Sequence, residues 1–310
     1  MKKLGLLLAL ISIGFNSCRE SKPASKATVE KPAAYELESL AVNGDTLHYL
    51  DVGKGEPIIF VHGSIGDYRA WETQIDTFAT KYRVIAYSRR YAWPNAKPLS
   101  DTLDYSAGQH AKDLTKLIKT LNLGQVYLVG HSYGGYTVLK TAIDHPELVK
   151  SMVLGEPPAA PLIAGSKEGD SLLNDFQNNV LKPAGEFFSE QQKDSAVATF
   201  VAGVMGSQEV YGAVPSEVRK RWLMNTTESE GGLLTDSWTP VTTDEVKQLQ
   251  IPTLLITGEF SPRFFGKIVD TLVALLPKNE LKLLPKASHG LQTENPKEFN
   301  TMVLNFLDKN

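Results

Sequence analysis

Short apolar runs alternate with amphipathic stretches along most of the chain. Runs bounded by glycine or turn residues predict strands at 46–53, 57–63, 82–87, 126–130, 150–156, 251–258 and 280–284. Apolar residues at helical spacing predict helices at 68–79, 105–124, from the end of the 126–130 run to about 143, and 296–308. Because strands that are apolar throughout alternate with helices, we predict an α/β fold with a mostly parallel central sheet and helices on both faces.

Residues 157–245 interrupt this alternation. They lack strand-like runs and carry helical patches rich in large apolar side chains, among them Phe187, Phe188, Trp222 and Trp238. We therefore predict a helical insertion at 157–245 within one α/β core, which is formed by residues 35–156 and 246–310.

The first 18 residues have the pattern of an export signal. Lys2 and Lys3 precede an apolar run at 4–15, which is too short to span a bilayer, since a span needs roughly 20 residues, but suits the core of a signal peptide. The run ends just before Cys18, the only cysteine of the chain. This arrangement resembles a bacterial lipoprotein signal, in which the cysteine is lipidated and becomes the mature N-terminus.

The lipoprotein resemblance implies a lipid anchor at Cys18 and a place in the bacterial cell envelope, facing the periplasm or the exterior. An ordinary cleaved signal peptide, giving a periplasmic or secreted protein, is the alternative. Residues 19–34 are rich in Ser, Lys, Ala and Pro and contain almost no large apolar side chains, so we expect a flexible linker there.

Composition and charge exclude some classes of partner. The chain has 32 Lys and Arg against 35 Asp and Glu, a net charge of -3, so it lacks the excess of positive charge that nucleic-acid binding requires. No metal-binding constellation or dinucleotide fingerprint is present in the sequence. We therefore expect no nucleic-acid partner and no cofactor. The pattern does not indicate an oligomeric state.

The segment 128–136, LVGHSYGGY, contains the pattern G-x-S-x-G around Ser132. It follows an apolar strand directly and opens a helix, which is the sharp turn that raises a serine hydroxyl above the edge of a sheet. Glycines are needed there because neighbouring backbone leaves no room for Cβ atoms. Ser132 is therefore a candidate nucleophile.

Three motifs in order resemble the α/β-hydrolase fold family over residues 46–308. They are VHGSIGD (61–67), LVGHSYGG (128–135) and ASHGLQTENPKEF (287–299). The resemblance implies that Ser132 is the nucleophile and His289 its base. It also implies an oxyanion hole made of the backbone N–H groups of Ser64 and Tyr133, and a cap formed by residues 157–245.

The pattern leaves two candidates, both glutamates, for the acid of the triad. The commoner family arrangement places an aspartate three residues after Gly258, where this chain has Ser261, which carries no charge. Glu259 lies nearby. Some members, the haloalkane dehalogenases among them, take the acid from the strand that follows the nucleophile helix, where this chain has Glu156. We favour Glu156 and keep Glu259 as the alternative.

The resemblance implies a serine hydrolase that cleaves a small, apolar carboxylic ester through an acyl-enzyme at Ser132. A serine nucleophile argues against dehalogenase and epoxide-hydrolase chemistry, in which the family uses aspartate. Alternatives are a non-catalytic ligand-binding protein on the same fold, and a C–C bond hydrolase or perhydrolase using the same triad. Arg89 follows the 82–87 strand, and we interpret it as a structural ion-pair donor.

Overall fold

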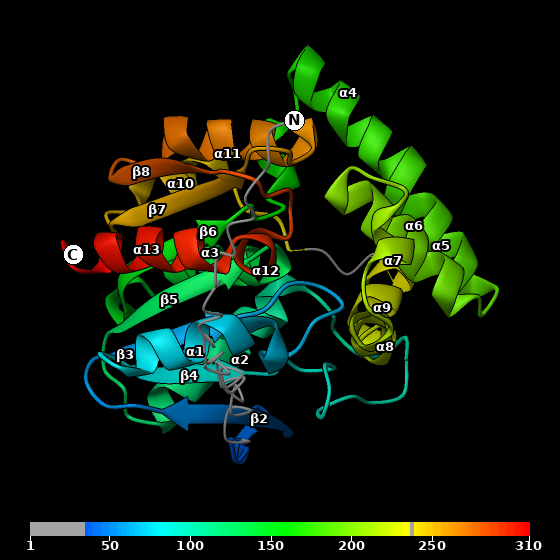
Figure 1. The fold of residues 1–310 in the computed structure, drawn as a ribbon. Coiled ribbons are helices and arrows are strands. Elements are labelled where there is room, and N and C mark those ends of the chain that lie inside the picture. The colour runs from blue at the N-terminus through cyan, green and yellow to red at the C-terminus, as the bar shows by residue number, and fades with distance from the viewer. Residues whose placement is uncertain (1–34, 236–238) are drawn as a thin grey trace, which may run out of the picture. The chain divides into compact units, whose positions relative to one another are not determined.

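An eight-stranded sheet forms the centre of the fold in the computed structural model (Figure 1). The strand order is β1-β2-β4-β3-β5-β6-β7-β8. All neighbouring pairs from β4 to β8 are parallel, and only β1 and β2 run antiparallel to their neighbours. The strands span Glu38–Val42, Asp45–Val52, Pro57–Val61, Arg83–Tyr87, Val126–His131, Val149–Gly155, Thr253–Gly258 and Asn279–Leu284. The predicted fold class is confirmed.

The structure describes residues 35–235 and 239–310. The predicted signal (1–18), Cys18 and the predicted linker (19–34) lie outside the described residues. No helix among the described residues is long and apolar enough to cross a membrane.

Helices cover both faces of the sheet (Figure 1). On one face α1 packs against α13, and on the other α2, α3 and α11 share an apolar core with the central strands. The core helices are α1 (Glu72–Ala79), α2 (Ala107–Thr120), α3 (Tyr133–Asp144), α10 (Thr243–Gln248), α11 (Arg263–Leu275), α12 (Leu291–Glu294) and α13 (Pro296–Leu307). Short 3₁₀ turns lie at Tyr68–Trp71, Pro146–Leu148 and Ala160–Ile163.

The segment 157–245 is helical wherever the structure describes it in regular structure, and it carries no strand in its described residues. Its helices are α4 (Lys167–Phe176), α5 (Lys182–Ser189), α6 (Lys193–Met205), α7 (Val210–Ala213), α8 (Ser216–Met224) and α9 (Thr227–Thr235), with a π-helical turn at Gln177–Leu181 between α4 and α5. We call residues 157–245 the helical insertion. In Figure 1 these green-to-yellow helices stand together to one side of the sheet.

A second apolar cluster joins the helical insertion to the core. It contains Phe188, Val197 and Val201 of the insertion together with Ile65, which follows β3. Burial of such side chains contributes about 1.5–3 kcal/mol each, so the insertion is held against the core by its own apolar contacts.

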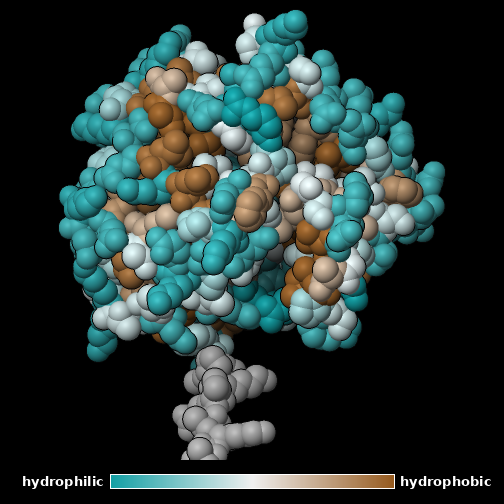
Figure 2. Space-filling view, turned by 45° about the horizontal axis from the view of Figure 1, so that its top comes forward, coloured by the Kyte–Doolittle hydropathy of each residue, from teal (hydrophilic) through white to brown (hydrophobic). Residues whose placement is uncertain are grey.

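The outer surface is mostly polar on the face drawn in Figure 2, where brown side chains form separate patches among teal ones. The large apolar side chains that the described residues leave exposed are Leu99, Met224, Leu234, Phe260, Leu281 and Leu283.

Candidate active site

Ser132 occupies a strained turn between β5 and α3. Its backbone has φ 53° and ψ -125°, a conformation that non-glycine residues adopt at a cost and that is common at functional sites. A Cβ on Gly134 would lie 2.1 Å from the carbonyl oxygen of Val61, and one on Gly130 would lie 2.5 Å from that of Gly134. These two positions therefore require glycine. Because glycine stands at both, β5 and α3 can approach closely enough to place Ser132 at the tip of the turn.

His289 lies in the loop between β8 and α12, with its ring against Ser132. The Nε2 atom of His289 is 3.0 Å from the Ser132 Oγ. The ring of Phe265 stacks on the imidazole, with centroids 3.8 Å apart and planes at 17°. The neighbouring His131 ring holds the loop through its Nε2, which is 2.7 Å from the carbonyl oxygen of His289. The imidazole is thus fixed by contacts on several sides.

Glu156 follows β6 directly and faces the other nitrogen of His289. Its Oε2 lies 2.6 Å from the His289 Nδ1. Its Oε1 accepts hydrogen bonds from the Thr257 hydroxyl at 2.7 Å and from the Gly258 N–H at 2.9 Å. Because a carboxylate only accepts, His289 Nδ1 carries the proton, which leaves Nε2 to accept from Ser132.

The Glu156 carboxyl stays charged despite being fully buried. Burial acts to raise its pKa, but hydrogen bonding and attraction from His289, together with the Ser261 and Thr257 hydroxyls, outweigh burial and lower the pKa below its usual value. The site therefore holds a fixed negative charge behind the imidazole.

The structure does not bring Glu259 to the imidazole. Its carboxylate is exposed, and its Oε2 accepts a hydrogen bond from the backbone N–H of Lys286 at 2.8 Å. Of the two glutamates that the sequence left open, only Glu156 contacts His289 within the described residues.

The two residues predicted to supply oxyanion donors both line the same cavity as Ser132. Tyr133 follows Ser132 directly and is the first residue of α3. Within the described residues, the backbone N–H of Ser64 makes no hydrogen bond. The Ser64 N–H is therefore available to a substrate oxygen.

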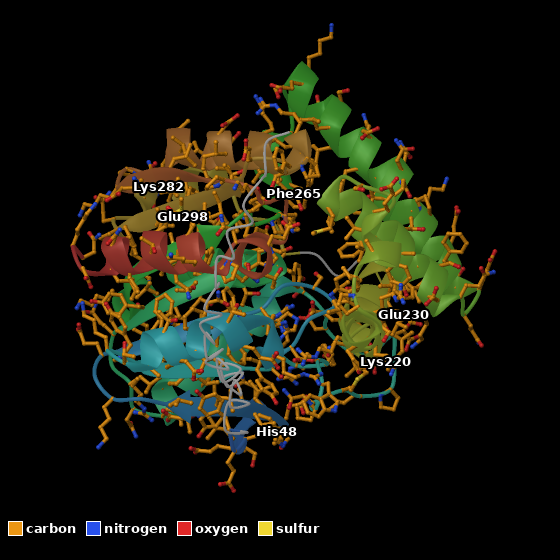
Figure 3. The ribbon with its side chains drawn as sticks, in the orientation of Figure 1. His48, Lys220, Glu230, Phe265, Lys282 and Glu298 are labelled. Carbon is orange, nitrogen blue, oxygen red and sulfur yellow. The ribbon has the colours of Figure 1, made fainter. Side chains whose placement is uncertain are left out.

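A cavity of about 350 Å³ lies over Ser132, between the core and the helical insertion. Its apolar part is built from both, and the rings of Phe176 in α4 and Phe264 in α11 stack at 4.1 Å. In Figure 3, Phe265 lies at the end of α11 that faces the insertion. The apolar lining residues are Pro158, Ala160, Leu173, Phe176, Leu181, Phe200, Val204, Leu233, Phe264 and Phe265.

One charged residue of the cavity was not identified from the sequence. Glu228, in the first turn of α9, is the only charged side chain among the described residues that line the cavity. It forms a buried ion pair with Arg89, whose Nη1 lies 2.7 Å from the Glu228 Oε2. Burial acts to raise the pKa of Glu228, but Arg89 and His110 hold it at about 2. Nothing in the local sequence around 228 signals this role, because the partner is 139 residues away.

Within residues 35–235 and 239–310, no group of three or more His, Cys, Asp or Glu side chains could hold a metal ion.

Comparison with known families places this geometry in context. Residues 56–296 match the family described as the alpha/beta hydrolase fold. The chain belongs to the alpha/beta hydrolase fold family. Membership agrees with the order of strands and helices along the chain.

Relatives within this family carry out different reactions. The chain is 25% identical to a 2-hydroxy-6-oxo-6-(2'-aminophenyl)hexa-2,4-dienoic acid hydrolase of Metapseudomonas resinovorans, over 92% of this chain and 96% of the relative. It is 28% identical to a non-heme chloroperoxidase of Kitasatospora aureofaciens, over 86% of this chain and 98% of the relative. The solved structure of a carboxylesterase from Bacillus subtilis superposes with a TM-score of 0.68, at 19% identity, covering 90% of this chain and 93% of that one.

These similarities support one coarse functional statement, that the protein is a hydrolase. They do not select a substrate, because the matched relatives of the alpha/beta hydrolase fold family act on different bonds.

Proposed function

We propose that the protein is a serine hydrolase that cleaves small, uncharged carboxylic esters through an acyl-enzyme at Ser132. The observation that carries the proposal is the chain of contacts Ser132 Oγ to His289 Nε2 at 3.0 Å and His289 Nδ1 to Glu156 Oε2 at 2.6 Å. This is the nucleophile, base and orienting acid that acyl transfer requires.

In the proposed reaction, the Ser132 hydroxyl attacks the ester carbonyl carbon and its proton passes to His289 Nε2. The charged Glu156 stabilises the imidazolium that forms. The N–H groups of Ser64 and Tyr133 bind the oxyanion of the tetrahedral intermediate. As the intermediate collapses, the imidazolium gives its proton to the departing alcohol and leaves the acyl group on Ser132.

Hydrolysis of the acyl-enzyme repeats the sequence with water as the nucleophile. His289 Nε2 takes a proton from water, the hydroxide adds to the acyl carbon, and the proton returns to Ser132 as the carboxylic acid is released.

The cavity supports an uncharged, apolar substrate. Its walls are mostly aromatic and aliphatic, which suits an acyl or alcohol group without charge. The only charged side chain among its described lining residues is Glu228, and a substrate carboxylate beside it would be repelled. We therefore propose that the helical insertion acts as a cap that selects by apolar fit.

The same observation favours an ester over the acid substrate for which one relative is named. The Metapseudomonas relative is named for a dienoic acid substrate, and a buried carboxylate needs a cationic or hydrogen-bonding partner. Among the described residues lining this cavity there is no Lys or Arg. Ester hydrolysis is thus better supported than C–C bond cleavage of a dienoic acid.

The test is a substrate panel on the purified protein. We expect kcat/KM for p-nitrophenyl acetate, butyrate and hexanoate to be at least about tenfold higher than kcat/KM for p-nitrophenyl hemisuccinate. The hemisuccinate would place a carboxylate in the cavity. A preference for the hemisuccinate would contradict the proposal. If a 2-hydroxy-6-oxo-hexa-2,4-dienoic acid were turned over faster than every ester of the panel, the alternative function, C–C bond hydrolysis, would be favoured.

A fluorophosphonate probe separates catalysis from mere binding. We expect the probe to label the wild-type protein at Ser132 and not a Ser132→Ala variant, because labelling needs an activated hydroxyl. A wild-type protein that resists the probe and binds esters without cleaving them would support the ligand-binding alternative.

For location, we propose that Cys18 carries a lipid anchor and that the enzyme works at the bacterial cell envelope. The support is the sequence alone: a positive start, an apolar run too short to span a bilayer, and the single cysteine at its end.

A further inference from the structure

A buried cluster of charges joins the helical insertion to the core beside the cavity. Arg89 follows β4 and is 1% exposed, and Glu228 of α9 is 6% exposed. The two side chains meet twice, at 2.7 Å through Nη1 and at 2.9 Å through Nη2. His110 of α2 approaches the same carboxylate, with its Nε2 3.0 Å from Oε2. The core arginine is therefore held by an acid that belongs to the insertion.

The same guanidinium reaches past Glu228 to the backbone beside the nucleophile. Its Nη2 donates a hydrogen bond to the carbonyl oxygen of Gly63 at 3.0 Å. The Cζ atom of Arg89 also lies 5.1 Å from the centroid of the Tyr133 ring. Arg89 thus touches both segments that supply the proposed oxyanion donors.

A second donor converges on the Gly63 carbonyl. The backbone N–H of Arg89 donates to His62 Nε2 at 2.9 Å, so this nitrogen accepts and the proton of the neutral ring sits on Nδ1. His62 Nδ1 in turn donates to the Gly63 carbonyl oxygen at 2.8 Å. Burial, and then the charge of Arg89, lower the pKa of His62 to about 3, which keeps the ring neutral, and the hydrogen bond from the Arg89 N–H selects the tautomer.

The Gly63 carbonyl and the Ser64 N–H belong to one peptide group. Because a peptide is planar, fixing the oxygen also fixes the direction of the N–H. Hydrogen bonds to the oxygen polarise the group and make its N–H a stronger donor. The charge-assisted bond from Arg89 is the stronger of the two, and the Ser64 N–H has no partner within the described residues.

We infer that Arg89 is a positioning residue that aims and polarises the Gly63–Ser64 peptide of the oxyanion hole, and that Glu228 of the helical insertion holds Arg89 in that position. The inference rests on the proposed function, since it assigns a role within that reaction. If the inference holds, the position of the helical insertion on the core affects how well the Ser64 N–H binds the oxyanion.

Stability alone is a weak reason for such a pair. Two charges removed from water cost several kcal/mol in desolvation, and an apolar pair of similar volume is often equally stable. A role in orienting the peptide gives the pair a function that an apolar replacement would lack.

The main test variant carries Arg89→Met with Glu228→Gln, which removes both charges and leaves no unpaired ion in the interior. Its readouts are kcat and KM for p-nitrophenyl butyrate, the Ki of phenylboronic acid, which forms a tetrahedral adduct on the serine, and the Tm. The matched control is Glu230→Gln on the same helix, whose partner Lys193 lies 3.1 Å away within the insertion; Figure 3 labels Glu230 on α9.

We expect the double variant to lose about tenfold to a hundredfold in kcat, somewhat less than loss of an oxyanion donor itself, with KM within about threefold. The Ki of phenylboronic acid should rise by the same factor as kcat falls, because both report binding of a tetrahedral oxygen. A merely structural role would lower the Tm without that parallel. The Glu230→Gln control should match the wild type in all four quantities.

A second variant keeps the inference testable if the double variant does not fold. Arg89→Lys retains the charge, but a single ammonium lacks the planar fork that serves Glu228 and Gly63 together. We expect kcat and boronic acid affinity to weaken in parallel in this variant as well.

The inference is overturned if the folded double variant, or Arg89→Lys, keeps kcat and Ki within about twofold of wild type while Ser132→Ala is inactive. A wild-type protein without esterase activity, or an active Ser132→Ala variant, would instead overturn the proposed function.

Discussion

The Nδ1 atom of His289 lies 2.6 Å from the Oε2 atom of Glu156, at the end of the strand that follows the nucleophile helix. Glu156 itself has a positive φ of 46°, an uncommon conformation for a non-glycine residue that is kept where the surroundings determine it. The backbone turns sharply at this point, and the carboxylate points back across the sheet edge to the imidazole.

Removing either the nucleophile or the base should stop turnover. We expect Ser132→Ala and His289→Ala each to lower kcat by about a thousandfold or more, because the two groups act as one unit. Tm should remain close to that of the wild type in both variants. Ester hydrolysis within about tenfold of wild type in either folded variant would argue against these assignments.

The two glutamates should differ sharply in their effect on rate. Glu156→Gln keeps the shape but loses the charge that orients the imidazole and balances the imidazolium, so we expect kcat to fall about a hundredfold or more. Glu259→Gln should change kcat by less than about threefold, since its carboxylate is exposed and bound to the Lys286 N–H. Steady-state kinetics on both variants beside wild type decide the matter, and the reverse ranking would move the acid to Glu259.

We expect that the catalytic carboxylate can be moved from Glu156, after β6, to position 261, after the neighbouring strand β7. The Ser261 hydroxyl makes no hydrogen bond within the described residues, but it lies near enough to Glu156 to help lower the pKa of that carboxyl, so we expect a carboxylate at 261 to approach the same imidazole. We expect Ser261→Asp in a Glu156→Ser background to recover about tenfold or more of the lost kcat. Ser261→Asn in that background is the uncharged control and should recover none. Equal rates in the two double variants would show that position 261 cannot serve.

Acidification should destabilise the fold through two histidines, the fully buried His62 and the partly buried His131. Burial, followed by the charge of a neighbour (Arg89 for His62, His289 for His131), lowers each pKa from 6.5 to about 3. The unfolded chain therefore binds more protons, and the stability from each neutral ring, complete above pH 6.5, declines as pH falls toward 3. The slope is about 1.4 kcal/mol per pH unit for each histidine.

Urea unfolding at pH 7, 6 and 5 measures this dependence. His131→Gln removes one of the two titrating groups, so its free energy of unfolding should vary less steeply with pH by about one proton. A variant with the same slope as wild type would show that His131 is not a source of the pH dependence.

Anchoring can be tested at a single atom. If the sulfur of Cys18 carries lipid, the wild-type protein should sediment with membranes and incorporate labelled fatty acid when expressed in bacteria, because a lipid chain adds about 0.8 kcal/mol of membrane affinity for each buried CH₂. Cys18→Ser should lose the label and move to the soluble fraction. A serine variant that stays equally membrane-bound would point to another anchor.

The sequence predicted the sheet and the neighbourhood of the site because both depend on local signals. Apolar strands between glycine turns revealed seven of the eight strands, and the glycines around Ser132 revealed a turn that no larger residue fits. The edge strand β1 is not predicted, since its sequence ESLAV begins with two polar residues and an edge strand buries little. Helix α11 is not among the predicted helices, although it has a clear apolar face. The face consists of Phe264, Phe265, Ile268, Val269 and Leu272.

Contacts between distant segments could not be predicted in the same way. The choice between Glu156 and Glu259 depended on which strand end faces the His289 loop, a relationship set by strand order and not by spacing along the chain. The Arg89–Glu228 pair depends on how the insertion folds back onto the core. The sequence indicated an ion-pair role for Arg89 but gave no means of finding its partner.

The position of the acid after β6 has a consequence for how this enzyme can evolve. In the proposed triad the acid is Glu156, and the turn after β7 leads directly into Phe264, which lines the cavity and stacks on Phe176 of the helical insertion. The proposed acid and this part of the cavity wall thus lie on different segments of the chain. Under the proposed function, a substitution at Phe264 alone can reshape this wall of the cavity, while the contact between Glu156 and His289 and the stacking of Phe265 on His289 are inherited unchanged.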